Sequence, residues 1–205
     1  MSVSQITDLR KQLQEQFPRA HRGLDLPKDT ELDPLSLSFP AGTLHELVAP
    51  GLCSGVSLMI SQLLEHSRDL PLALIDGRDS FDPASYGSEK CRRLFWIRCR
   101  EAMQAIQCAD LLLRDGNLPL ILLDLHLTSA RELKRIPNAI WHRFRTESRA
   151  SGASLLALTP RPCLPSPHSR FTLSSTFTLQ NLEMDPPPAE SNELRRGPRG
   201  RPFLR

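Results

Sequence analysis

The sequence predicts an α/β fold in which a mainly parallel sheet is flanked by helices. From Phe39 onward, short apolar runs alternate with longer stretches of helical spacing, a pattern typical of parallel sheets covered by helices. One run, Leu118–Leu125, is apolar at nearly every position, as expected of a central strand buried on both faces. With 205 residues, 40% hydrophobic and 24% charged, the chain is long enough for one domain with tails.

The predicted elements follow from these runs and from the turn residues between them. The strands are expected at Leu44–Val48, Leu72–Asp76, Leu94–Arg98, Leu118–Leu125, Ser154–Leu158 and Phe171–Leu179. The helices between them are expected at Val56–His66, Arg100–Arg114 and Ala139–Arg149.

The segments outside this domain are predicted separately. Residues 1–18 form an amphipathic helix, because Ser2 is a suitable N-cap and apolar residues recur at helical spacing before Pro18: Ile6, Leu9, Leu13 and Phe17. Residues 19–38 read as a linker, 39–182 as the core domain, and 183–205 as a disordered tail rich in proline and arginine. The apolar stripe of the first helix is open to two interpretations, docking on a partner protein or packing on its own domain.

Several protein classes are disfavoured. No apolar run approaches the roughly 20 residues of a membrane helix, and the N-terminus lacks the basic start and apolar stretch of a secretory signal, so we expect a cytoplasmic protein. The cysteines are odd in number and never spaced as CxxC, which favours reduced thiols over disulfides or a metal site. They are Cys53, Cys91, Cys99, Cys108 and Cys163.

Positive charge is concentrated late in the chain, whose net charge is +3. The tail carries Arg195, Arg196, Arg199, Arg201 and Arg205. A second basic stretch, beside the apolar Ile140, Trp141 and Phe144, carries Arg131, Lys134, Arg135, Arg143, Arg145 and Arg149. Both groups are candidates for contact with DNA phosphates, or are simply solvated, and the tail could also contact an acidic protein surface.

The segment from Phe39 to Ser57 resembles the RecA family. In that family a strand enters a phosphate-binding loop, G-x-x-x-x-G-K-[ST], whose amides and lysine hold the nucleotide phosphates. The corresponding positions here are Pro50, Gly51, Gly55, Val56 and Ser57. Valine in place of the lysine supplies neither positive charge nor a hydrogen bond. The loop is therefore either a degenerate nucleotide cradle or an ordinary strand-to-helix turn that needs glycine.

Two further positions extend the resemblance through residue 180. After the apolar strand ending at Asp76, the family places a glutamate that orients the attacking water, where this chain has Arg78. Asp124 ends the next apolar strand and matches the aspartate that helps to hold magnesium, although aspartate there also commonly caps a turn. His45 and Glu46 have no accompanying nucleophile motif and are assigned a structural or surface role on a predicted edge of a strand.

Within the RecA-like group, the segment Phe39–Leu47 resembles the corresponding segment of the ImuA proteins, which are related to the division inhibitor SulA. The resemblance implies a non-enzymatic accessory protein without cofactors, acting in translesion synthesis during the SOS response to DNA damage. It implies RecA and a Y-family-like polymerase subunit as partners, with DNA contact through the tail. Two alternatives remain: a SulA-like inhibitor of FtsZ, and an ATPase with an unusual cradle that uses Arg78 or a partner's arginine.

Overall fold

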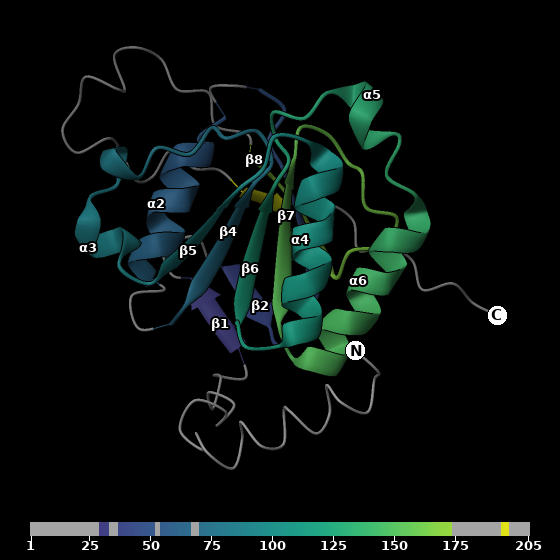
Figure 1. Cartoon of the computed structure of the whole chain (residues 1–205), viewed down its shortest axis with the longest axis horizontal. Coiled ribbons are helices and arrows are strands. Elements are labelled where there is room, and N and C mark those ends of the chain that lie inside the picture. Colours follow the sequence, from purple (N-terminus) through teal and green to yellow (C-terminus); the bar gives the residue numbers. More distant parts are fainter. Residues whose placement is uncertain (1–28, 33–36, 52–53, 67–69, 174–193, 197–205) are drawn as a thin grey trace, which may run out of the picture.

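The computed structural model describes residues 29–32, 37–51, 54–66, 70–173 and 194–196 (Figure 1). Its main strands are β3 Leu44–Val48, β4 Leu72–Asp76, β5 Leu94–Arg98, β6 Leu120–Asp124, β7 Ser154–Thr159, β8 Ser169–Leu173 and β9 Leu194–Arg196. The helices are α2 Val56–His66, α3 Ser88–Cys91, α4 Ala102–Asp115, α5 Ala130–Leu133 and α6 Asn138–Ser151, with a 3-10 turn at Pro83–Ser85.

These strands form a seven-stranded sheet in the order β5-β4-β6-β7-β3-β8-β9. Strands β3 to β8 pair in parallel, and the short β9 pairs antiparallel with β8. Strand β6 lies in the interior of the sheet, as its continuous apolar sequence predicts. The topology is α/β with a parallel sheet flanked by helices, consistent with a RecA-like or Rossmann-type class.

Helices cover both faces of the sheet, with α2 on one face and α4 and α6 on the other (Figure 1). Because side chains alternate along a strand, β4 directs Leu72 and Leu74 to the α2 face, and Ala73 and Ile75 to the α4 face. Each fully buried aliphatic side chain of leucine size contributes about 1.5 to 3 kcal/mol of hydrophobic stabilisation. The strands therefore need apolar residues at consecutive positions.

Helix α4 packs on the sheet through a stripe at helical spacing: Ala102, Ala105, Ile106, Ala109 and Leu113. It ends at Gly116, whose φ of 72° lies in the left-handed region and whose amide donates to Leu112. A Cβ at Gly116 would lie 3.3 Å from the Cβ of Ser151 at the end of α6. Glycine here allows the ends of the two helices to approach closely.

Several predicted boundaries are confirmed. Strands β3, β4 and β5 and helix α2 have the predicted bounds, and α4 and α6 begin and end within two residues of theirs. Strand β8 begins at Ser169, before the predicted start at Phe171. Its added residues Ser169 and Arg170 pair with β3.

Two segments outside the predicted domain contain strands. Residues 29–32 and 37–40 form an antiparallel pair, β1 (Asp29–Leu32) and β2 (Leu37–Pro40), largely within the stretch interpreted as a linker. Strand β9 lies in the 183–205 tail, so the prediction of disorder does not hold for these three residues. The predicted helix over 1–18 lies outside the described residues. No described helix is long and apolar enough to cross a membrane.

Candidate functional site

The positions that carry the RecA resemblance meet at one edge of the sheet. Parallel strands β3, β4 and β6 all end there, followed by the turn 50–55, by Arg78 and by the segment after Asp124 (Figure 1). In open α/β sheets this carboxyl edge is where ligands bind. The edge is therefore the candidate site, and its chemistry depends on what each side chain contacts.

The described residues of the turn after β3 hydrogen-bond to one another. The amide of Ser54 donates to the Gly51 carbonyl at 3.3 Å, and the Ser54 hydroxyl donates to the same oxygen at 2.6 Å. Gly55 has a φ of 83°, and its carbonyl accepts the first hydrogen bond of α2, from Met59 at 3.0 Å. Pro50 and Gly51 are exposed. This geometry favours the ordinary strand-to-helix turn.

Val56, at the lysine position, is part of the hydrophobic core. Its side chain is 6% exposed and belongs to the cluster between α2 and the sheet. A lysine here would bury its stem in the α2 interface before its ammonium reached the carboxyl edge. Val56 therefore supplies a core contact and no charge at this position.

Tyr86, which no sequence motif indicates, lies beside Ser57. Its hydroxyl hydrogen-bonds with Ser57, and its ring stacks on Phe81 with the centroids 4.9 Å apart. Burial is the main cause of the raised pKa of Tyr86, and the Asp124 carboxylate raises it further. Tyr86 is the only tyrosine of the chain and follows Asp82-Pro83. Its rarity is the one sequence signal that could have singled it out, because it belongs to no recognised motif.

Arg78 is held by an ion pair across the carboxyl edge. Its guanidinium binds the Glu132 carboxylate on α5, and it also donates to the Arg100 carbonyl at 3.5 Å. Glu132 additionally accepts from the hydroxyl of Ser129, the N-cap of α5, at 2.8 Å. That hydrogen bond first, and the Arg78 charge next, hold the pKa of Glu132 below its usual value. Arg78 thus joins the turn after β4 to α5.

Asp124 caps the turn that follows it. Its side chain is 5% exposed and one carboxylate oxygen accepts from the backbone amide of His126 at 3.0 Å and from His126 Nδ1 at 2.6 Å. The Asp124 carbonyl accepts from the Gly77 amide at 3.0 Å, which ties the ends of β6 and β4 together. Of the two roles that the sequence left open for Asp124, magnesium ligand or turn cap, these contacts are those of a turn cap.

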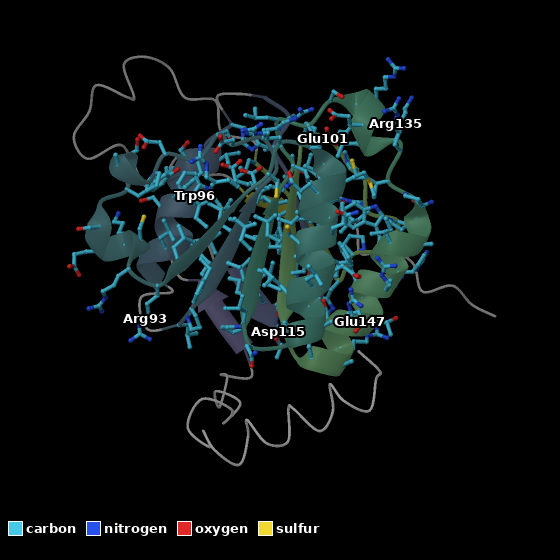
Figure 2. The ribbon with its side chains drawn as sticks, viewed as in Figure 1. Arg93, Trp96, Glu101, Asp115, Arg135 and Glu147 are labelled. Atoms are coloured by element: carbon cyan, nitrogen blue, oxygen red, sulfur yellow. The ribbon has the colours of Figure 1, made fainter. Side chains whose placement is uncertain are left out.

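Asp76, at the end of the neighbouring strand β4, is fully buried, and both of its carboxylate oxygens accept hydrogen bonds. Its carboxylate accepts from the amides of Ser80 and Phe81 at 3.0 and 2.8 Å and from the Trp96 indole at 3.4 Å. It orders the turn 76–81, and its bond to Trp96 joins β4 to β5, whose Trp96 packs against the hydrophobic cluster on the α2 side of the sheet (Figure 2). Asp76 is therefore a structural carboxylate.

His45 and Glu46 are not at a strand edge, so that placement was wrong. Both are 0% exposed, because β3 lies between β7 and β8. One Glu46 oxygen accepts from Thr159, from the Cys163 amide at 2.6 Å and from the Leu164 amide, while the other accepts from Arg170 at 2.5 Å. Glu46 joins β3 to β7, to β8 and to the segment between them, which is a structural role.

The buried His45 is neutral. Its Nε2 lies 2.5 Å from the Thr43 hydroxyl, which donates to the Pro40 carbonyl. Since that hydroxyl proton is used, Nε2 carries the imidazole proton and donates it to Thr43. Burial, and next the charge of His168, lower the pKa of His45 to about 3.

The remaining predicted residues are distributed as follows. The basic residues from Arg131 to Arg149 lie on or beside α5 and α6, and Arg143 pairs with Asp110 of α4 at 2.7 Å. In β9, Arg195 and Arg196 pair through their backbones with β8. The stripe Ile6, Leu9, Leu13 and Phe17 and the tail residues Arg199, Arg201 and Arg205 lie outside the described residues.

The described part of the chain holds no cluster of three or more His, Cys, Asp or Glu side chains suited to a metal ion. Its four cysteines, Cys91, Cys99, Cys108 and Cys163, are free thiols, with the sulfurs of Cys99 and Cys108 4.0 Å apart. No protein-family model and no curated protein matches the chain, so its function has to be argued from the residues of the carboxyl edge.

Proposed function

We propose that this chain is a non-catalytic RecA-like accessory protein of DNA-damage-induced mutagenesis. It acts through contacts, bringing together RecA, a Y-family-like polymerase subunit and damaged DNA. The partners follow from the resemblance of Phe39–Leu47 to the ImuA proteins.

The proposal rests mainly on one observation. The side chains at the positions that would handle a nucleotide are engaged in contacts within the protein. Val56 packs in the core, Arg78 pairs with Glu132, and Asp124 caps its own turn through His126. A phosphate-binding loop needs free amides and a lysine, and hydrolysis needs a carboxylate near the attacking water. These residues stabilise the edge of the sheet instead of contacting phosphates.

An accessory protein of this kind needs accessible surface for its partners. Among the described residues, the edge strand β5 pairs with β4 alone, and Phe95 on it is 57% exposed. Open strand edges are templates for pairing with another chain, and exposed aromatic residues anchor such contacts. The β5 edge therefore supports a role in protein docking.

Capture by immobilised RecA tests the proposal. We expect the full chain to bind RecA, with weaker binding for a chain lacking residues 1–17 and for Phe95→Glu. Leu111→Glu, at a residue of α4 that is 61% exposed, is the matched control and should bind normally. Binding to neither RecA nor the polymerase subunit would reject the proposal. Binding to FtsZ instead would favour the SulA-like alternative.

A further inference from the structure

A groove of about 380 Å³ lies between α5, the start of α6 and the segment that follows β7. The buried side chains of Leu133, Ile136 and Trp141 lie along it, each no more than 6% exposed. Two cationic side chains, Lys134 and Arg161, line it. Leu133, Ile136 and Trp141 belong to the hydrophobic cluster on the α4 and α6 face of the sheet, whereas Val56 belongs to the cluster on the α2 face.

The cations beside the groove are positioned to meet an anionic group. Lys134 is exposed, and Arg161 donates through one nitrogen to the Ala130 carbonyl at 2.9 Å, which fixes its guanidinium beside α5. The exposed Arg131 on α5 and Arg135 just after it add positive charge nearby (Figure 2).

Two carboxylates near the groove, Glu132 and Glu46, are already paired. Glu132 of α5 binds Arg78 and Ser129. Glu46, which accepts from the backbone amide of Cys163 behind the groove wall, binds Arg170. These ion pairs leave the charge of Lys134 and Arg161 without a carboxylate partner among the described residues.

We propose that this groove binds a short acidic segment of a partner protein. One apolar side chain of that segment enters the groove over Leu133, Ile136 and Trp141, and the flanking carboxylates meet Lys134 and Arg161. Pockets of about 300 Å³ or more accommodate such an anchor, and complementary charge around it steers association and sets specificity. The proposal is independent of the emptied nucleotide site.

Nucleic acid fits the groove less well than an acidic peptide. Single strands are held by stacking bases on accessible aromatic rings. Trp141 is only 2% exposed and packs edge-to-face on Phe144, with the ring centroids 5.8 Å apart. Trp141 therefore offers no stacking platform for a base.

The test uses the full chain and a fluorescent peptide of sequence Asp-Asp-Leu-Phe-Glu-Glu, with binding followed by fluorescence anisotropy. A second peptide with serine for both apolar residues tests the anchor. Lys134→Glu reverses a charge at the groove, and Arg149→Glu does so at an exposed residue near the far end of α6. Asn138→Trp fills the groove without changing charge, and Ala139→Trp adds the same side chain at the next position, outside the lining.

We expect saturable binding of the acidic peptide that weakens as salt is added. Lys134→Glu and Asn138→Trp should each weaken it about tenfold, since each removes one component of the contact. Arg149→Glu and Ala139→Trp should bind like the original chain, and the serine peptide should bind more weakly. No binding up to about 1 mM, equal loss in the control variants, or displacement by a single-stranded DNA oligonucleotide would overturn the proposal.

Discussion

Arg78 and Glu132, 54 residues apart in the sequence, form an ion pair that joins the turn after β4 to α5 at the carboxyl edge of the sheet. Arg78 stands where a RecA-type ATPase has the glutamate that orients water. The position is thus occupied by a residue that binds a neighbouring element. The same pair also occupies the carboxylate of Glu132 on α5, beside the proposed groove.

Replacing Arg78 by glutamate should weaken the fold and leave the chain without ATPase activity. Both side chains are about 30% exposed, so solvent screening limits the pair to about 0.5 to 1 kcal/mol. Two carboxylates facing each other add a similar penalty. Chemical denaturation should therefore show a lower free energy of unfolding for Arg78→Glu than for Arg78→Gln. Equal stability of the two variants would show that Glu132 does not face residue 78.

Removing the carboxylate of Glu46 should destabilise the fold severely. Arg170 would remain as a partly buried charge and two backbone amides would lose their acceptor. Breaking a buried pair on one side costs about 3 to 5 kcal/mol. Denaturant unfolding of Glu46→Ala measures this, with the exposed Glu89→Ala as control. A loss below about 1 kcal/mol would contradict the role assigned to Glu46.

Stability should fall with acidification because of His45. Its folded pKa of about 3 is below the ordinary histidine pKa of 6.5, so between these pH values the unfolded chain binds a proton that the folded chain does not. The contribution is complete above the unfolded pKa and decreases as the pH falls toward the folded pKa, by about 2 kcal/mol at pH 5. Unfolding of the original chain and of His45→Gln, compared at neutral pH and at about pH 5, isolates this slope. Identical pH dependence would show that His45 titrates normally.

Gly77 should not tolerate a side chain. A Cβ there would lie 2.6 Å from the Asp124 carbonyl oxygen, at the point where the ends of β4 and β6 meet. Gly77→Ala should therefore cost about 1 to 3 kcal/mol, as overpacking does in well-packed interiors. Gly51→Ala is the control, since nothing lies within 4 Å of its Cβ position. Equal melting temperatures of the two variants would contradict the close approach.

The sequence predicted the parts of the fold that local patterns determine. The bounds of β3, β4, β5 and α2 follow from apolar runs and the turns that end them. The β1–β2 pair was not predicted because its first strand, Asp-Thr-Glu-Leu, is mostly polar. The contacts of the site could not be predicted because they join residues far apart in the sequence. Glu46 and Arg170, for example, are 124 positions apart. Local sequence contains no signal for such pairs, nor for the contact between Tyr86 and Ser57.

A thermal-shift titration with ATP and magnesium tests the central claim most directly. A ligand that binds only the folded chain, at about a hundred times its dissociation constant, adds about 2.7 kcal/mol to its stability, a readily measured increase in melting temperature. Because Val56, Arg78 and Asp124 are engaged within the protein, we predict no shift at millimolar ATP. A saturable shift that is lost when magnesium is withheld would contradict the account and favour the unconventional ATPase.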